Sequence, residues 1–468
     1  MTECNGERVT SRGPGRREFT ASFDGGQISS DAGGLLLHEV DRRLSLFDRF
    51  ASCFHDYRDP SRIDHSVRDL VAQRVMAIAL GYEDLNDHDE LSRDPLLAAL
   101  VGKADPTGLE RRRDRDRGRP LASSSTLNRV ELSRSGEASK DRYRRIELSS
   151  DAVDELLVDL FVESHADEPE EIILDFDATD DPIHGRQEGR FFHGYYDCYC
   201  YMPLYIFAGD HLLSARLRMS NQDGAAGSLE ELQRIVAQLR TRWTKTRIIV
   251  RADSGFCRNG FLDWCEENGV DYVIGLARNA RLESELEDHL LDAEDLCESF
   301  GRKVALFHCF NWRTIDSWSR ERRVIGKAEC SRKGRNPRFI VTSLPCDDHH
   351  EAERIYRDIY CQRGEMENRI KEQQLDLFAD RTSAHTMQAN QIRLYFSSIA
   401  YVLVDALRRI GLKGTEAERA QCGTIRLKLL KIGARVRVTC RRIWINMSSA
   451  CPYKDIFFAA WRNICATT

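Results

Sequence analysis

The chain has 468 residues, of which 41% are hydrophobic and 31% charged, and its formal net charge is −6. This balance is typical of a globular protein with a sizeable core, and any basic surface must be regional. The polar residues 1–17 and the lack of any apolar stretch of roughly 18 residues exclude a secretory signal and a membrane-spanning helix. We therefore expect a cytoplasmic protein whose 15 cysteines are reduced thiols rather than a disulfide framework.

The N-terminal region is predicted to be mainly helical. Residues 18–35 are rich in Gly, Ser and Asp, which indicates a short strand and turns. Between residues 35 and 100, apolar residues recur at three- and four-residue spacing, the pattern of amphipathic helices. Residues 103–120 are charged and punctuated by Gly and Pro, as in a linker or an exposed arm, and residues 123–126 can cap a following helix.

From about residue 150 the pattern becomes an alternation of strands and helices. The predicted order is strand, strand, strand, helix, strand, helix, strand, which indicates an α/β domain that opens with antiparallel strands. A β-rich block and two long helices are expected to follow. Strands are predicted at 171–177, 194–209, 211–218, 247–252 and 272–276 and within 303–345, and helices at 228–242, 260–268, 352–375 and 387–410.

Two basic segments are candidates for DNA contact. Residues 419–454 contain nine Lys or Arg and no acid, which favours contact with phosphates, and we single out Arg435, Arg437 and Arg441. The arginines within 111–119 form the second candidate. Asp114 and Asp116 dilute the charge of that cluster, so a solvated linker remains the alternative there.

Acidic residues end two of the predicted strands. Asp177 closes the strand 171–177, and Asp175 lies on the same face of that strand. An acid inside a strand is costly unless it is paired or bound to a metal. Asp253 directly follows the strand 247–252, at the carboxyl end where α/β folds place their sites. A simple solvated turn is the alternative at both positions.

A third acid lies on the predicted helix 352–375. Tyr360, Arg363, Glu367 and Lys371 follow three- and four-residue spacing and form one stripe along that helix. The alternative is a solvated face with a Glu367–Lys371 ion pair. Three carboxylates from two strand ends and a helix match what two Mg²⁺ ions about 4 Å apart require for phosphodiester chemistry. We therefore expect Asp177, Asp253 and Glu367 to bind Mg²⁺, for which Mn²⁺ would substitute.

Further motifs make the sequence recognisable. They are residues 29–34, 81–88 with Asp94 and Pro95, 175–181 with His184 and Gly185, and 251–256, together with the stripe at 360–371. In this combination the chain resembles bacterial insertion-sequence transposases of the insertion sequence 1380 family, within the broad DDE transposase superfamily. One position departs from the signature of the superfamily, because Gln374 stands where a Lys or Arg is usual, and Lys371 can supply that cation instead.

The resemblance implies a ribonuclease-H-like mixed-sheet core with a β-rich insertion before the helix that carries the third acid. The core would comprise residues 151–297 and 351–415 and the insertion residues 298–350, after a DNA-binding helical region at 1–150 and before a basic region at 416–468. Asp177 would bridge two metals, with Asp253 and Glu367 completing one site each. Asp175 is the rival for the first place. Tyr360, Arg363 and Lys371 would contact the end of the transposon.

The resemblance implies a reaction in which terminal inverted repeats are cleaved and joined to target DNA, in a homo-oligomer assembled on DNA near the bacterial nucleoid. A catalytically silent DNA-binding protein and a non-transposing metal-dependent nuclease are the alternatives. The roles of four further side chains remain open between two alternatives. His184 and His193 are either structural or close to the cut phosphate, and Trp312 and Trp318 either belong to a core or stack an unpaired base.

Overall fold

The computed structural model describes residues 8–346 and 349–466, and the chain divides into two compact units. Unit 1 contains the residues up to Ser149, the short segment Leu375–Ala379 and the residues from Phe396 onward. Unit 2 contains Ser150–Gln374 and Asp380–Tyr395. Among the described helices, none is both long and apolar enough to cross a membrane.

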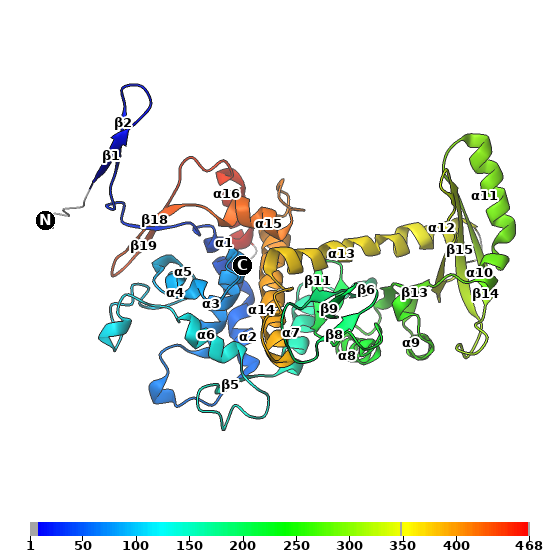
Figure 1. Cartoon of the computed structure of the whole chain (residues 1–468), viewed down its shortest axis with the longest axis horizontal. Coiled ribbons are helices and arrows are strands. Elements are labelled where there is room, and N and C mark those ends of the chain that lie inside the picture. The colour runs from blue at the N-terminus through cyan, green and yellow to red at the C-terminus, as the bar shows by residue number, and fades with distance from the viewer. Residues whose placement is uncertain (1–7, 347–348, 467–468) are drawn as a thin grey trace. The chain divides into compact units, whose positions relative to one another are not determined.

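Unit 1 is mainly helical, with small sheets at its surface (Figure 1). The pair Asp94-Pro95 begins a helix, because the Asp94 carboxylate accepts hydrogen bonds from the backbone N–H groups of Leu96 and Leu97. The helices are α1 (Gly34–Leu44), α2 (Leu46–Ser52), α3 (Val67–Leu80), α4 (Asp87–Leu91), α5 (Pro95–Leu100), α6 (Ser124–Glu131), α15 (Cys422–Ile425) and α16 (Lys454–Ala466). The strands are β1 (Val9–Arg12), β2 (Glu18–Ala21), β3 (Gln27–Ser29), β4 (Phe54–Asp56), β5 (Ile146–Leu148), β18 (Ala434–Val438) and β19 (Ile443–Met447).

A buried carboxylate ties the beginning of unit 1 to its end. Asp31 accepts a hydrogen bond from the Tyr82 hydroxyl at 2.7 Å and forms an ion pair with Lys431 at 2.6 Å. The Lys431 ammonium also lies over the Tyr82 ring, 4.1 Å from its centroid. Nearby, the Ser29 hydroxyl donates to Asp94 at 3.0 Å. The motifs at 29–34, 81–88 and 94–95 therefore meet in one structural network within unit 1.

Unit 2 is built on a mixed sheet of nine strands. Its main path runs β11-β10-β6-β12-β13-β17-β15-β14, and β16 pairs with β15. β6, β12 and β13 are mutually parallel neighbours, and the other pairs are antiparallel. The strands are β6 (Glu171–Ala178), β10 (Leu204–Ala208), β11 (His211–Arg216), β12 (Arg247–Ala252), β13 (Asp271–Leu276), β14 (Val304–Trp312), β15 (Arg322–Ser331), β16 (Gly334–Arg335) and β17 (Arg338–Thr342).

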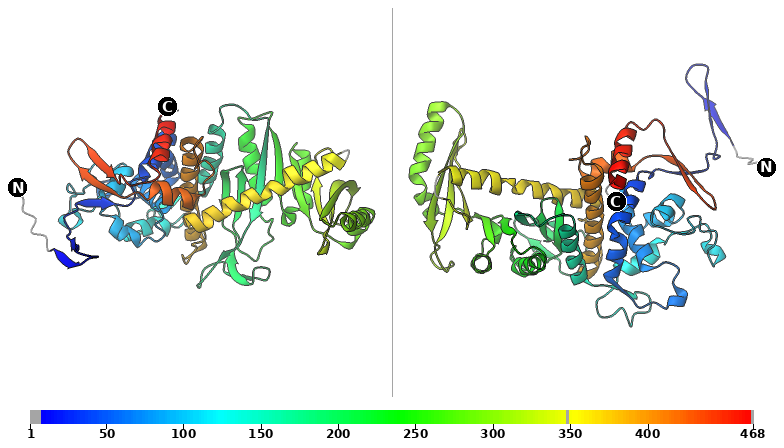
Figure 2. Two further views of the ribbon diagram at one scale, coloured as in Figure 1. Left: turned by 90° about the horizontal axis from the view of Figure 1, so that it is seen from above. Right: turned by 180° about the vertical axis from the view of Figure 1, so that it is seen from behind.

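Helices cover both faces of this sheet. Leu174 and Val250 belong to the larger core, which packs under α7 (Ser150–Glu163), α8 (Ser228–Arg240), α9 (Asn259–Glu267), α10 (Ala280–Glu285) and α11 (Glu287–Phe300). Ile249 and Val273 face the other way, against a helical rod that crosses the strands (Figure 2). The β-rich segment after β13 therefore extends the central sheet by β17, β15 and β14.

The rod differs from the single regular helix predicted at 352–375. It begins as α12 (His349–Arg354), widens to a π-helix at Ile355–Ile359, tightens to a 3₁₀ turn at Tyr360–Arg363, and continues as α13 (Gly364–Lys371). Changes of winding inside a helix often occur at functional sites, because they re-aim side chains that regular spacing would place elsewhere. A second π-helical turn, Glu372–Asp376, follows α13, and α14 (Met387–Ala406) begins in unit 2 and ends in unit 1.

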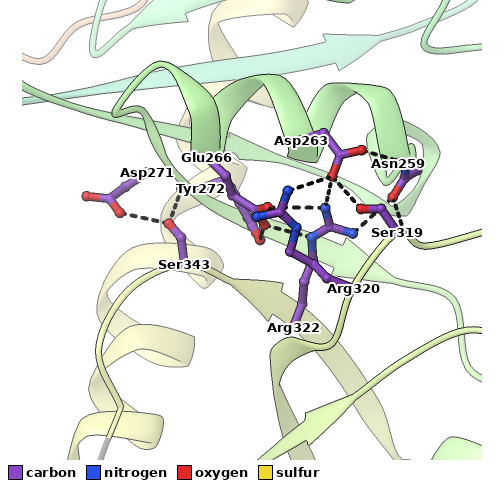
Figure 3. A network of polar contacts seen from close by, with 9 residues as sticks. All are labelled: Asn259, Asp263, Glu266, Asp271, Tyr272, Ser319, Arg320, Arg322 and Ser343. Atoms are coloured by element: carbon purple, nitrogen blue, oxygen red, sulfur yellow. Dashed lines mark hydrogen bonds and ion pairs between the residues drawn. The ribbon is translucent and has the colours of Figure 1, made fainter.

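A polar network fixes the sheet extension to α9 (Figure 3). The buried Arg322 guanidinium donates to Glu266 at 2.7 Å, to Asp263 at 2.5 Å and to Asn259 at 3.1 Å. The Tyr272 hydroxyl donates to the same Glu266 carboxylate at 2.7 Å. Because these partners of Arg322 all lie on α9, the start of β15 is held in one position against that helix.

Candidate active site

One cavity in unit 2, of about 350 Å³, is lined by the three acids that were predicted to bind metal and by two of the cations that were predicted to contact DNA. Its walls come from the end of β6, the residue after β12, the turn before β9 (Cys198–Tyr201) and the part of the rod from Arg363 to Gln374. The lining residues are Asp177, Ala178, Thr179, Tyr195, Tyr196, Asp253, Arg363, Glu367, Ile370, Lys371 and Gln374. The structure thus brings Asp177, Asp253 and Glu367 to one place.

The register of two parallel strands explains why the two aspartates meet. Arg251 pairs with Asp175 and Ala252 pairs with Phe176 across β12 and β6. The next residues along these strands are Asp253 and Asp177, so both emerge at the same end of the sheet. Asp253 also accepts a hydrogen bond from the Gly255 N–H at 2.8 Å, which turns the chain away from the cavity.

Asp175 lies on the same face as Asp177 but is fully engaged elsewhere. The Arg251 guanidinium donates to both carboxylate oxygens of Asp175, at 2.7 Å from Nη2 to Oδ2, and also to the Ile359 carbonyl. Burial raises the pKa of Asp175, and the Arg251 charge opposes that rise. Asp175 does not line the cavity. Its contacts join β6 and β12 to the rod, a structural role.

The rod supplies the third carboxylate together with a cation. Arg363 forms ion pairs with Glu367 at 2.8 Å and with Asp177 at 3.5 Å, so its guanidinium bridges a strand and the rod. The Glu367 side chain is 42% exposed and that of Asp177 only 14%. Lys371, one turn further along α13, lines the same cavity. The cavity therefore combines an acidic floor with two cations at one wall.

The grouped carboxylates of the cavity favour the binding of a cation. Burial is the main reason that the pKa of Asp177 rises to about 7; the neighbouring Asp253 and Glu367 carboxylates add to this rise, and Arg363 opposes it. Carboxylate oxygens are the ligands that Mg²⁺ prefers, so the donor set fits this ion. Across the described ranges, however, no three acidic, His or Cys side chains are grouped closely enough to hold a metal. The cavity therefore fits Mg²⁺ in the type of its oxygen ligands, while Arg363 lies between Asp177 and Glu367.

Two other residues of the predicted stripe region have different surroundings. The Tyr360 side chain does not line the cavity; its hydroxyl lies 2.7 Å from the position that a Cβ on Gly275 would take. Tyr360 therefore packs beneath the strand end at β13. Gln374 does line the cavity, and its side-chain amide donates to the Asp180 carbonyl at 3.1 Å. A cation at position 374 would replace this bond to the loop after β6.

Sequence reasoning missed the aromatic part of the cavity. The predicted strand 194–209 is divided into β9 (Cys198–Tyr201) and β10, and Tyr195 and Tyr196 lie in the turn that precedes β9. His184 and His193 are outside the cavity lining, although the His193 ring contacts Tyr196 at 5.0 Å. Trp312 and Trp318 are both buried and contact each other edge to face, so they belong to the core. The missed signals were Pro203, which interrupts the predicted strand, and the polar Asp197 between aromatic residues.

The basic C-terminal region belongs to unit 1 and is only partly available for contact. Arg435, Arg437 and Arg441 are exposed on the hairpin of β18 and β19. Trp444 on the same hairpin is 40% exposed and has the Arg437 guanidinium 5.6 Å from its ring centroid. By contrast, Lys431 and Arg426 of the same cationic tail are used internally, the latter bonded to the Ala79 carbonyl at 3.1 Å.

Comparison with known proteins identifies the family. No curated protein matches the chain. A solved structure described as a piggyBac transposase synaptic complex with hairpin DNA aligns with 86% of this chain and 80% of its own, at 10% identity and a TM-score of 0.40, which is too distant to carry an argument. The family model described as transposase DDE domain group 1 matches residues 12–468. Because this match covers nearly the whole chain, the protein belongs to the DDE transposases.

Proposed function

We propose that this protein cleaves the ends of an insertion sequence and transfers the freed strands to target DNA by two-metal phosphodiester chemistry. The observation that carries the proposal is the convergence of Asp177, Asp253 and Glu367 on one cavity from β6, β12 and α13. The strand order β11-β10-β6-β12-β13, with its parallel and antiparallel pairs, supports a ribonuclease-H-like core. The sequence motifs support membership of the insertion sequence 1380 family.

The three carboxylates are proposed to hold two Mg²⁺ ions, with Mn²⁺ as a substitute. When bound, such ions would activate a water or 3′-hydroxyl and stabilise the leaving oxygen of the phosphodiester. The protein's own part is to orient Asp177 and Asp253 through the paired register of β6 and β12. Asp175 is not proposed as a ligand, since Arg251 engages both of its oxygens.

DNA contacts are proposed in each unit separately. Arg363 and Lys371 would bind phosphates near the cut, because both line the cavity and cationic side chains form strong hydrogen bonds with phosphate oxygens. Tyr360 would support that wall from below. In unit 1, Arg435, Arg437 and Arg441 would bind phosphates of the transposon end. Assembly of two or more copies on paired ends is proposed from the resemblance.

The test uses duplexes copied from the inverted repeats that flank the gene. Purified protein with Mg²⁺ should cut a labelled end at a defined position, and Asp253→Asn and Glu367→Gln should each abolish the cut. Glu365→Gln is the matched control, since Glu365 is exposed on the same helix and does not line the cavity. Cleavage that survives in Asp253→Asn would refute the site. Cutting without preference for ends would favour a plain nuclease, and binding without cutting a silent DNA-binding protein.

A further inference from the structure

An exposed aromatic ring stands at the cavity that contains the three carboxylates. The Tyr195 side chain is 86% exposed, yet it lines the same cavity as Asp177 and Asp253. Exposed apolar side chains are common on protein surfaces, so the exposure of this ring alone indicates nothing. Its place in the lining of the cavity with the three carboxylates is what points to contact with a ligand.

The backbone around Tyr195 is built to present the ring. β8 (Phe191–His193) pairs antiparallel with β9, and His193 faces Cys198 at the end of the hairpin. The turn between them contains Asp197 with a φ of 53°, a left-handed conformation that few side chains adopt. β9 is also anchored on its other edge by β7 (Asp181–Pro182). A paired, anchored hairpin thus holds the turn that carries Tyr195.

A second tyrosine braces the first. The Tyr196 ring meets the Tyr195 ring at 5.0 Å in an edge-to-face arrangement, and its other neighbour is the His193 ring at 5.0 Å. Burial and the nearby carboxylates raise the pKa of Tyr196 to about 12, so its hydroxyl stays neutral beside the acids. Tyr195 therefore has one edge supported and the rest of its ring open.

The charged residues of the cavity indicate which kind of ligand can contact the Tyr195 ring. Arg363 and Lys371 at the wall of the cavity suit phosphate oxygens. When a phosphodiester binds there, the nucleobase of the same nucleotide lies next to the cavity. An unpaired base offers a flat π-face, and stacking on an exposed aromatic ring is tolerant of sequence. The two tryptophans that the sequence offers for this task, Trp312 and Trp318, are buried. Tyr195 has the exposure and the place that they lack.

We propose that Tyr195 forms a stacking subsite for one unpaired nucleobase beside the phosphodiester bound in the cavity. The subsite rests on the proposed function, because the carboxylate cavity defines where the nucleic acid lies. The subsite adds a preference among DNA substrates, which the carboxylates alone do not provide. DNA whose end is open, with a base free to leave the duplex, binds better than DNA held fully paired.

The probe is a short duplex with an unpaired oligothymidine tail, compared with the same duplex carrying a tail of abasic residues. Both tails keep their phosphates, so only base contacts distinguish them. Binding is measured by fluorescence anisotropy in Ca²⁺, which supports binding without requiring cleavage. One stacked base corresponds to a preference of about 5- to 150-fold for the thymidine tail. Tyr195→Ala should remove most of this preference, and Tyr195→Phe should keep it.

Phe192→Ala is the matched control, because Phe192 is an exposed aromatic residue of the same hairpin that does not line the cavity. It should leave the preference unchanged. Equal binding of the two tails by the wild-type protein, or an undiminished preference in Tyr195→Ala, would overturn the subsite. The subsite would also be overturned if Phe192→Ala and Tyr195→Ala lowered the preference for the thymidine tail equally. The same holds if light scattering shows that Tyr195→Ala changes only the self-association of the protein.

The two proposals fail in different ways. If the wild-type protein cuts element ends with metal but shows no tail preference, the stacking subsite is wrong and the transposase chemistry stands. If the preference is present and depends on Tyr195 but no metal-dependent cut occurs, the subsite stands as a nucleic-acid contact and the catalytic proposal fails.

Discussion

Replacing Asp177 by Asn should make the metal-free protein more stable at neutral pH. The ordinary pKa of this carboxyl is 3.8, and in the folded chain it rises to about 7 because the group is buried beside Asp253 and Glu367. As pH rises between these two values, the unfolded chain releases the proton while the folded chain retains it. Folding therefore loses stability through this interval and reaches a constant penalty above about pH 7.

The size of that penalty follows from the interval. Each pH unit between the two pKa values is worth about 1.4 kcal/mol, so the wild-type protein carries a penalty of at most about 4 kcal/mol above pH 7. The amide introduced by Asp177→Asn cannot ionise, so the variant avoids this penalty. In urea unfolding with a chelator present, the advantage of Asp177→Asn should grow from about pH 4 to about pH 7 and then level off.

Metal provides the second half of this experiment. Mg²⁺ at about pH 8 should raise the unfolding midpoint of the wild-type protein, since it binds the ionised folded form, and should have little effect on Asp177→Asn. Glu365→Gln serves as the control and should follow the wild-type pH profile. If Asp177→Asn is no more stable than wild type at about pH 8, or if its advantage is the same at every pH, the reasoning about the cavity is refuted.

Three further variants test the framework around the cavity. Asp175→Asn should cost about 3 kcal/mol in urea unfolding, because it leaves the Arg251 charge buried without its partner; a loss below about 0.5 kcal/mol would contradict the structural role. Gly275→Ala should lower the thermal midpoint and the cleavage rate together, since the new methyl carbon would lie 2.7 Å from both the Tyr360 hydroxyl and a backbone nitrogen; unchanged values would mean that the strand end is looser than described. Arg322→Met, which keeps much of the side-chain length but removes the charge, should cost about 3 kcal/mol in the same unfolding assay, and an equal cost in high salt is expected because the guanidinium is buried.

The framework of the site was predictable because its signals are local. The apolar run 247–252 predicted β12 with the bounds that the structure has, and the run 171–177 predicted β6 to within one residue. An acid directly after such a run is an observation within a few residues. The grouping of Asp177 with Asp253 then needed only the general rule that parallel strands end together. The roles of these acids stay a prediction until the variants are measured.

What the sequence could not provide were contacts between distant segments. Whether Asp175 or Asp177 faces the cavity depends on Arg251, 76 residues away, and on the register that pairs the two strands. In the sequence, Arg251 stands out only as part of a motif. The winding of the rod was equally hidden, since residues 355–363 carry the ordinary helical spacing although the structure departs from it.

Some misses had a signal that could have been used. The alternation of Arg435 and Arg437 with valines, followed by the alternating segment 443–447, is the pattern of a hairpin, and the structure forms β18 and β19 there. Leu282, Leu286 and Leu290 recur at four-residue spacing within a highly charged segment, and all three are buried, in α10, in the residue that joins the two helices and in α11. In both places the high charge of the segment masks the periodicity.

The pairing of β3 with β18 sets an order of events during synthesis. Gln27 and Ser29 leave the ribosome long before their strand partner β18, and the cation of Asp31 lies 400 residues further along the chain. Unit 2, which carries the carboxylates, can fold before β18 and β19 of unit 1 have been synthesised. A polypeptide that ends before β18 therefore carries an intact set of acids with no closed N-terminal sheet and no Arg435 hairpin. Because β18 and β19 follow every acid of the cavity in the chain, the basic hairpin is added only after those acids have been synthesised.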